Sequence, residues 1–531
     1  MEHLSQMTRL RRVPPALVGW IIVAVGLALR LAVAWSDVAT LVEKALPDDA
    51  FYYFIIVENA LAGRGITFDG LAPNNGFHPL WALLLAPILA LAPSRDVALH
   101  VALTVASLFE AGTIYLAYRA GRRFLQDELA GLLAAVFYAL NPRLILEGVN
   151  GLETALSTLV FAGTAVWYWN MRARAGDLPG LKRWIGLGLL TGLLLWSRTD
   201  HIFFIVAIGL DALLHWRRRV LPSLVVAGAV CAGLLSPWLA WNSFTFGSPL
   251  QSSGVAVPYV VRTYLFQLSQ AAGLLRVIGP ALYLLSVLLS TLVDYLWLPL
   301  GAILAYLVWR IVNGGRPNRA SLPPAWSIPM IGSGALLLFH ALVRYFLRGW
   351  YVIPFAFSIS VLAGALLAHL GRSRAGRPLA QLVFRVGSSL VIVVTFIGSG
   401  LPLWNNGAYP WQSAMRQAGQ WAAQELPAGT VIGSFNAGII RWFSGQPVLN
   451  LDGVVSGPAF EAIRRRGLLG FARQHGVQVI LDWQSSVERT YAPFFESDYR
   501  QALEPITQFA APAGAPAVWD LLVAYRLKPS S

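Results

Sequence analysis

The chain is best understood from one short segment, Pro47-Asp48-Asp49-Ala50-Phe51-Tyr52-Tyr53. Two adjacent carboxylates follow the first long apolar stretch and open an amphipathic segment. Most other apolar stretches carry few charges, whereas polar residues are dense just after this one: Arg64, Asp69, Asn74, Asn75 and His78. We interpret this part of the chain as the floor of a polar site that the remaining sequence holds at a membrane surface.

The composition is that of an integral membrane protein. Of 531 residues, 56% are hydrophobic and 12% are charged, and the mean hydropathy is +0.59, whereas a soluble domain carries about 25% charged residues. Arginine in cytoplasmic loops explains the net charge of +14, so we expect no nucleic-acid partner. The single cysteine, Cys231, excludes an internal disulfide and a cysteine-based metal site.

Long apolar stretches alternate with arginine clusters up to residue 404. Because about 20 apolar residues cross a bilayer and basic flanks mark the cytoplasmic side, we expect a multi-pass cell-membrane protein with about eleven spans. Arg9, Arg11 and Arg12 place the N-terminus in the cytoplasm. The expected spans are residues 16–35, 97–118, 129–145, 154–169, two short helices within 184–216, 221–241, 288–310, 325–343, 350–370 and 386–404.

Two apolar stretches need a different interpretation. Residues 77–92 lie inside the first outer loop, residues 36–96, and a span there would move the cluster around Arg119 to the outside. We therefore expect a juxtamembrane or re-entrant helix. Residues 184–216 are interrupted by Arg198-Thr199-Asp200-His201 and have basic clusters at both ends. Two short helices that meet at these four residues, in a recessed polar cavity, satisfy both ends.

The composition changes after residue 404. Short apolar strands alternate with helical segments, which is typical of a small α/β domain, and the topology places it on the extracytoplasmic side. We thus predict two domains, a membrane domain over residues 1–404 and an α/β domain over 405–531. The expected strands are residues 431–434, 448–451 and 477–482, and the expected helices are residues 415–425, 437–443 and 459–475.

Five motifs in this order carry a resemblance to a known superfamily: DDAFYY at 48–53, NGFHPLW at 75–81, NGLETAL at 150–156, SRTDH at 197–201 and FNAGIIRWFSGQPVLNLDG at 435–453. With them the chain resembles the GT-C glycosyltransferases, in the branch of protein O-mannosyltransferases and lipid A aminoarabinose transferases. The resemblance covers nearly the whole chain. It departs where aminoarabinose transferases carry a lysine before Pro-Pro-Leu, since this chain has His78-Pro79-Leu80.

The resemblance implies a polytopic GT-C fold and a membrane glycosyltransferase. Such an enzyme moves a hexosyl or pentosyl group from a polyprenyl-phosphate sugar to an acceptor hydroxyl, on the extracytoplasmic side. The acceptor, in cell-envelope glycan, lipid or protein glycosylation, stays open. The alternative is a lipid or sugar transporter or flippase, which also has many spans and buried charges. A transporter usually shows two matching halves, and it does not need a polar first loop with an outer α/β domain.

The resemblance places the catalytic base at Asp48, with Asp49 as its partner or as a substrate or metal contact, and makes Glu153 the second acidic candidate. Adjacent carboxylates repel, which separates their pKa values and lets one act as a base. The alternatives are a carboxylate pair that stabilises a helix N-terminus and an interfacial Glu153. No His/Cys ligand set is present. An oxygen site for a divalent cation on these three carboxylates fits the sequence without being required, and no cofactor is.

The lipid phosphate of the donor needs cations. Arg344 and Arg348 lie at helical i, i+4 spacing, and arginine suits bidentate phosphate binding; the alternative is anchoring at the membrane interface. Arg198, Asp200 and His201 are ionisable groups at membrane depth, and such groups are functional by default. The alternative, equally consistent with the sequence, is that Arg198 and Asp200 form a structural ion pair. The substrate-binding candidates are Arg64, Asn75, His78, Arg198, Asp200, His201, Arg344, Tyr345, Arg348 and Tyr351.

Overall fold

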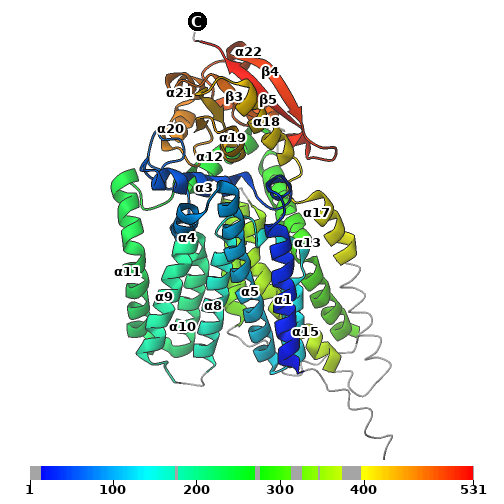
Figure 1. Cartoon of the computed structure of the whole chain (residues 1–531). Coiled ribbons are helices and arrows are strands. Elements are labelled where there is room, and N and C mark those ends of the chain that lie inside the picture. Colours follow the sequence, from blue (N-terminus) through cyan, green and yellow to red (C-terminus); the bar gives the residue numbers. More distant parts are fainter. Residues whose placement is uncertain are drawn as a thin grey trace, which may run out of the picture.

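The computed structural model describes residues 14–173, 177–268, 275–312, 326–344, 347–372 and 396–529. These residues form a bundle of apolar helices with a smaller domain, built from helices and a sheet, seated on one end (Figure 1). Helix α3 (Asp48–Leu61) lies across this end, beneath the smaller domain. The predicted fold class, a polytopic helical membrane protein with a C-terminal α/β domain, is confirmed.

The bundle has helices at most positions of the predicted spans, whereas the number of about eleven crossings stays a prediction. Within the described residues, helices long and apolar enough to cross a membrane occur at Pro15–Ala34, Arg95–Leu125, Thr199–Phe246, Ala281–Val308 and Ile353–Leu370. Helix α15 is the central one, since it packs against α5, α6 and α13. The helices of the bundle are α1 (Pro15–Ala34), α5 (Arg95–Leu125), α6 (Glu128–Ala139), α7 (Pro142–Glu147), α8 (Thr154–Arg172), α9 (Leu181–Ser197), α10 (Ile202–Trp216), α11 (Leu221–Phe246), α13 (Leu275–Val312), α14 (Ser327–Leu338) and α15 (Ile353–Arg372). Helix α12 (Ser253–Leu268) instead packs against the C-terminal domain, where Tyr259 contacts the rings of Phe460 and Phe494.

The break at 198–201 is present. Helix α9 ends where Arg198 takes an extended conformation (φ −160°, ψ 119°), a single 3₁₀ turn covers Thr199–His201, and α10 follows. The predicted pair of short helices is therefore confirmed. Helix α13 begins at Leu275, earlier than the predicted residue 288. The predicted span at 386–404 lies mostly outside the described residues, and its end belongs to a π-helical turn (Phe396–Gly400) and α17 (Leu401–Asn406).

The first loop carries three helices, α2 (Val38–Lys44), α3 and α4 (Pro79–Leu91). Helix α4 has 13 residues, a length of about 20 Å, which is less than the bilayer core of about 30 Å. It packs against α3, α5 and α9 at the end of the bundle nearest the smaller domain (Figure 1). This short helix agrees with the juxtamembrane or re-entrant element predicted for residues 77–92.

The C-terminal domain is built on a five-stranded mixed sheet in the order β2-β1-β3-β5-β4. Strands β2, β1 and β3 are parallel, with Ile432 opposite Val448 and Val479, and β5 is antiparallel to both β3 and β4. The strands are β1 (Ile432–Ser434), β2 (Val448–Asn450), β3 (Val479–Trp483), β4 (Leu503–Ala510) and β5 (Leu521–Leu527). The helices are α18 (Gln412–Glu425), α19 (Ala437–Ser444), α20 (Gly457–Arg465), α21 (Leu468–Gln474) and α22 (Tyr499–Ala502).

The predicted domain differs from the structure in two places. The helix expected over 459–475 is broken into α20 and α21, because Arg466 adopts a left-handed conformation (φ 55°) and Gly467 follows it. Strands β4 and β5 were not predicted. They pair with each other and join the sheet through β3 alone, so only long-range pairing places them.

The C-terminal domain is locked onto the first loop. The side chain of Gln412, at the start of α18, donates through Nε2 to the carbonyls of Val42 (2.6 Å) and Leu46 (2.7 Å). Its Oε1 accepts from the backbone N–H of Asp48 (3.0 Å). A Cβ at Gly438, in the first turn of α19, would collide with the Asp48 carbonyl, so glycine is required for this approach. The domain and Asp48 thus share one end of the bundle, and that this end is extracytoplasmic stays a prediction.

Candidate active site

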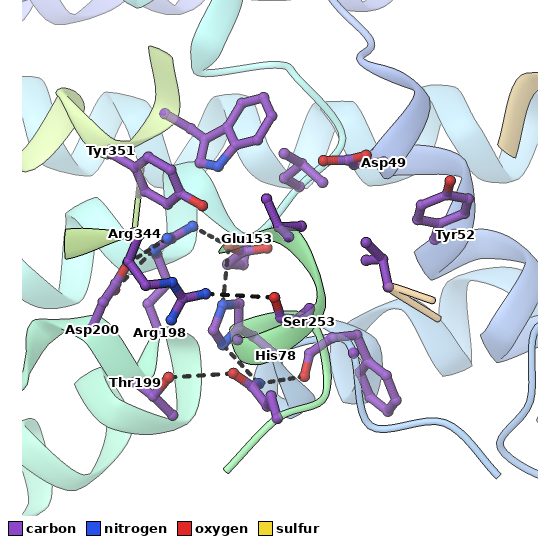
Figure 2. A pocket seen from close by; sticks show the side chains of 18 of the residues that line it. Asp49, Tyr52, His78, Glu153, Arg198, Thr199, Asp200, Ser253, Arg344 and Tyr351 are labelled. Carbon is purple, nitrogen blue, oxygen red and sulfur yellow. Dashed lines mark hydrogen bonds and ion pairs between the residues drawn. The ribbon is translucent and has the colours of Figure 1, made fainter. Parts of the chain in front are cut away.

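A polar cavity of about 220 Å³ lies where the bundle, α3, the start of α12 and the C-terminal domain meet (Figure 2). Residues from segments far apart in the sequence converge on it. Its ionisable lining residues include acids, arginines and histidines: Asp49, Glu153, Asp200, Arg198, Arg344, His78 and His340. The arrangement brings together six of the candidates that the sequence predicted, Asp49, Glu153, His78, Arg198, Asp200 and Arg344, and a seventh candidate, Tyr351, lines it as well.

The acidic side of the cavity is formed by Asp49, in the first turn of α3, and Glu153, directly before α8. Tyr53, one helical turn after Asp49, donates to Glu153 Oε2 at 2.6 Å and accepts from the His78 N–H at 2.9 Å. Burial raises the pKa of Asp49; the positive charge of Arg348 opposes this rise, and the negative charge of Glu153 adds to it. A carboxylate with a raised pKa is a stronger proton acceptor near neutral pH.

Asp48 faces the opposite way and does not line the cavity. Its carboxylate accepts from the backbone N–H groups of Ile439 (2.6 Å) and Gly438 (3.2 Å) at the start of α19. Burial, reinforced by the neighbouring Asp49, raises the pKa of Asp48 to about 7, although the N–H groups of α19 favour the charged form. This geometry does not fit the base that the sequence predicted at Asp48, because adjacent side chains on a helix point in different directions. Asp49 fits that role.

A network of ion pairs crosses the floor of the cavity (Figure 2). Arg198 pairs with Glu153 Oε1 and with Asp200 Oδ2, each at 2.6 Å, and its guanidinium lies 4.8 Å from the ring centre of Tyr351. His340 Nε2 lies 2.9 Å from the same Asp200 oxygen. Arg198 is 6% exposed and occupied by two carboxylates. Its geometry therefore favours the structural alternative, in which it holds Glu153 in place.

His78 is oriented by Gln251, which precedes α12. Gln251 Nε2 donates to the Phe77 carbonyl at 2.6 Å, which identifies that side of the amide as the donor, and it lies 3.2 Å from His78 Nδ1. Nδ1 therefore accepts, and the proton of the neutral ring sits on Nε2. Burial lowers the pKa of His78. His78 Nε2 lies 3.8 Å from Glu153 Oε1, so an N–H donor is presented at the cavity.

Arg344 is the cation that remains open to a ligand. It lines the cavity, and its one hydrogen bond runs to the Ser253 carbonyl at 3.5 Å; within the described ranges no carboxylate pairs with it. Arg344 and Arg348 do not share a helical face, which corrects the expected i, i+4 arrangement. The π-helical turn Phe339–Val343 ends at Arg344, and Arg348 is extended (φ −117°, ψ 160°). Tyr345 lies outside the described residues.

Three further candidates lie away from the cavity. Arg64, which lies beyond the end of α3, donates to the side chain of Asn59 within the helix. Asn75 fastens the first loop to the bundle, since it donates to Asn242 Oδ1 (3.2 Å) and accepts from the Ser252 N–H (3.0 Å). His201 is buried, and its Nε2 lies 2.7 Å from the Ser157 hydroxyl. The structure thus gives these residues local contacts and does not place them among the lining residues.

Several lining residues were not predicted: Tyr52, Tyr53, Gln251, Ser253, His340 and Trp350. Tyr53 had a usable signal, because it lies four residues after Asp49 on one amphipathic helix and therefore on the same face. His340 had a weaker one, an ionisable residue inside an apolar stretch. Gln251 sits in an ordinary turn sequence, and nothing local marks it.

An apolar groove of about 430 Å³ adjoins the polar cavity. It runs between α3, α4 and the aromatic residues of α9 and α11, and Phe77 lines both it and the cavity. Its aromatic and proline members include Trp196, Trp238, Trp241, Pro79 and Pro237. The groove and the cavity therefore adjoin at Phe77, which places apolar helix faces beside the Arg344 guanidinium and the neutral His78 N–H, an arrangement that suits a ligand with a long apolar tail and an anionic head.

The predicted divalent cation is not tested by the structure. Among the described residues, no group of three or more His, Cys, Asp or Glu side chains is arranged to hold a metal ion. Asp48 uses both oxygens on backbone N–H groups, so the three-carboxylate set is not assembled in this conformation. Asp49 and Glu153 remain on one side of the cavity, and sensitivity of activity to a chelator is the measurement that decides.

The chain has a GT-C fold, as its similarity to solved oligosaccharyltransferase and ArnT structures shows. Among solved structures it is similar to the oligosaccharyltransferase of Archaeoglobus fulgidus tethered to an acceptor peptide, with a TM-score of 0.60, 15% identity, and coverage of 98% of this chain and 74% of that one. It is also similar to AglB of the same organism in complex with an inhibitory peptide and a dolichol-phosphate (TM-score 0.59, 16% identity, 97% and 74% coverage).

A third similar structure matches over its whole length. ArnT from Cupriavidus metallidurans, bound to undecaprenyl phosphate, has a TM-score of 0.55 and 13% identity, with coverage of 96% of this chain and 99% of that one. At these identities the likeness establishes the fold. Residues 406–522 match a domain of unknown function, DUF8728. No curated protein matches the chain in sequence.

Proposed function

We propose that the protein is a glycosyltransferase that moves a monosaccharide from a polyprenyl-phosphate donor to an acceptor hydroxyl. The observation that carries the proposal is a pair of neighbouring hollows that share Phe77 as a lining residue: an apolar groove, and a polar cavity lined by the carboxylate of Asp49, by Arg344 and by His78. A lipid-phosphate sugar has the same order of parts: an apolar chain, an anionic group and a polar ring.

The donor phosphate is held by Arg344 and His78. Arg344 brings a planar guanidinium suited to phosphate oxygens, and His78, which lines the same cavity, presents its Nε2–H. The isoprenoid tail occupies the groove lined by Trp238 and Trp241. The solved structures with this fold support the choice of donor, since one is in complex with a dolichol-phosphate and another is bound to undecaprenyl phosphate.

Asp49 acts as the base. It takes the proton of the acceptor hydroxyl as that oxygen forms a bond to the anomeric carbon, and the bond from this carbon to the phosphate oxygen breaks. Polyprenyl phosphate leaves with the bonding electrons, stabilised by Arg344. The raised pKa of Asp49 suits the step, because a base whose pKa lies nearer to the working pH accepts a proton more readily.

Glu153 orients the site. Its Oε1 accepts a hydrogen bond from Arg198 and its Oε2 accepts one from the Tyr53 hydroxyl. Its negative charge raises the pKa of Asp49. Arg198 holds Glu153 through an ion pair, and Asp200 in turn pairs with Arg198. The transferred group is a hexosyl or pentosyl residue, the reaction takes place on the extracytoplasmic side, and the acceptor belongs to the cell envelope.

The test uses purified protein and a panel of radiolabelled undecaprenyl-phosphate monosaccharides, mixed with a cell-envelope extract as the acceptor source. We expect undecaprenyl phosphate release with one member of the panel. Asp49→Asn keeps the side-chain shape and removes the base, so its rate should fall by about 10²–10⁴-fold. Asp48→Asn is the matched control, one residue away in the same helical turn and outside the cavity lining, and its loss should be under about tenfold.

Two results contradict the proposal. If no member of the panel is turned over while the labelled lipids cross reconstituted vesicles, the protein is a carrier. If Asp48→Asn and Asp49→Asn lose equal activity, with equal thermal stability, the base belongs to the pair and the assignment to Asp49 fails.

A further inference from the structure

A buried carboxylate outside the cavity lining, Glu147, joins two walls of the candidate active site. It is the last residue of α7 and is 3% exposed. Its Oε1 accepts from the Tyr295 hydroxyl at 2.5 Å, and its Oε2 accepts from Asn150 Nδ2 at 2.9 Å. Both oxygens act as acceptors, which is the pattern of an ionised carboxylate. What Glu147 can do for the site is therefore to hold other residues in place.

Through Asn150, Glu147 holds the turn that carries Glu153. Asn150 Nδ2 donates to Glu147, and its Oδ1 accepts from the Leu152 N–H at 3.1 Å, so the two ends of this amide have different partners and its orientation is fixed. Leu152 and Glu153 both line the cavity, and Figure 2 shows the Glu153 side chain at its floor. The Glu147 carboxylate thus sets how this turn is presented to the cavity.

Through Tyr295, Glu147 supports a segment of another wall. Tyr295 belongs to α13 and is buried. A Cβ at Gly349 would collide with both the Tyr295 hydroxyl oxygen and Glu147 Oε1, so the backbone of this segment rests directly on the hydrogen-bonded pair. Trp350 and Tyr351, the next two residues, line the cavity. The pair therefore fixes how far these two aromatic side chains reach into it.

From these contacts we infer that Glu147 is a positioning residue for the proposed reaction, which sets the separation between the wall that carries Glu153 and the wall that carries Tyr351. The inference rests on the proposed function, because positioning has a meaning only for that reaction. Rates respond steeply to such placement, since an error of about 1 Å can cost about a hundredfold. The negative charge of Glu153 also raises the pKa of Asp49, so a shift of the turn reaches the base as well.

The proposed donor-phosphate site does not depend on Glu147. Arg344 donates to the Ser253 carbonyl, and His78 is oriented by Gln251. Neither contact involves α7 or the turn that follows it. We therefore expect changes at Glu147 to lower kcat and to leave the affinity for decaprenyl phosphate unchanged, whereas a general disturbance of the fold would change both.

The test exchanges the two members of the Glu147–Asn150 pair. Glu147→Gln supplies one acceptor oxygen for two donors, the Tyr295 hydroxyl and Asn150 Nδ2, so we expect kcat to fall by about ten- to a hundredfold. Adding Asn150→Asp should bring kcat back to within about threefold of the wild type, because the glutamine then donates to the new carboxylate, which still accepts from the Leu152 N–H. Asn150→Asp alone sets two carboxylates against each other and should also lose activity.

The measurements are kcat and KM with the donor of the panel that the wild type turns over, the affinity for decaprenyl phosphate, and the melting temperature. Tyr168→Phe is the matched control for Tyr295→Phe. Each removes a buried tyrosine hydroxyl from a carboxylate, but Tyr168 donates to Asp211 near the end of α8 that is remote from Glu153. Both variants should melt at a lower temperature, and only Tyr295→Phe should lower kcat.

Three outcomes overturn the inference. The first is a kcat in Glu147→Gln within about twofold of the wild type, or one that falls together with stability as in Tyr168→Phe. The second is a loss in Glu147→Gln that Asn150→Asp does not restore although stability recovers, since Glu147 would then take part in proton transfer itself. The third is a wild type that turns over no donor of the panel, which removes the proposed function and this inference with it, whereas the first two outcomes leave the proposed function standing.

Discussion

The Asp48 carboxylate, seated on the start of α19, predicts how stability changes with pH. Burial raises its pKa in the folded protein to about 7, from 3.8. A group with a raised pKa favours the folded state while it is protonated, and this contribution is lost as the pH rises through the folded value. The difference between 3.8 and about 7 corresponds to about 4 kcal/mol across the whole range, of which about 2 kcal/mol is lost between pH 5 and pH 7.

Asp48→Asn removes this dependence. The asparagine keeps one acceptor for the Ile439 N–H and loses the bond from Gly438, which costs about 1 kcal/mol. The variant should therefore be more stable than the wild type at pH 8, by about 3 kcal/mol, and this advantage should shrink to less than about 1 kcal/mol at pH 5, so that the two curves of melting temperature against pH converge as the pH falls.

The measurement is thermal unfolding in detergent, followed by the fluorescence of the 20 tryptophans between pH 5 and pH 8. Asp520→Asn, which changes an exposed carboxylate of the same domain, is the control and should run parallel to the wild type. Parallel curves for Asp48→Asn and the wild type would refute the reasoning, because they would mean that Asp48 titrates alike in the folded and unfolded chains.

Three further predictions concern the cavity. Arg344→Ala should weaken decaprenyl phosphate binding by about ten- to a hundredfold, and Arg344→Lys should restore it only in part, since lysine keeps the charge and loses the planar fork; unchanged affinity in Arg344→Ala would move the phosphate site elsewhere. Gln251→Glu should place a carboxylate beside His78 Nδ1 and raise the pKa of the imidazole, so that decaprenyl phosphate binds more tightly at pH 6 than at pH 8, whereas wild-type binding should change less over that range because His78 is neutral. Glu153→Gln should lower turnover less than Asp49→Asn, because Glu153 positions the site and does not accept the proton; an equal loss would give both acids the same role.

Much of the architecture follows from local pattern. Apolar length and arginine flanks place the spans, and the interrupted stretch around Arg198 predicts a helix break because no single span satisfies basic clusters at both ends. Strands β1 to β3 follow from short apolar runs between helices. Strands β4 and β5 do not, since their pairing is long-range and β4 alternates exposed and half-buried residues like any surface segment.

The sequence predicted many of the residues that form the site, but it predicted less well which way their side chains point. The DDAFYY segment marks the right helical turn, but whether Asp48 or Asp49 faces the cavity depends on how α3 rolls against α19, 390 residues away. The spacing of Arg344 and Arg348 looks helical in the sequence, whereas the helix ends between them. Gln251 acquires its place only when the segment before α12 folds onto the first loop, and His340 only when the turn after α14 packs against the helix break at Asp200.

The two carboxylates at the start of α3 also bear on how this protein can be recombined. Asp48 contacts the C-terminal domain, and the adjacent Asp49 lines the cavity. The position of Asp49 therefore depends on how that domain packs against α3. The C-terminal domain therefore cannot be exchanged for an unrelated domain without changing the cavity. In a chimera that joins this membrane domain to another C-terminal domain, Asp49 should keep its position only if the new domain also provides two backbone N–H groups and a glycine at Asp48.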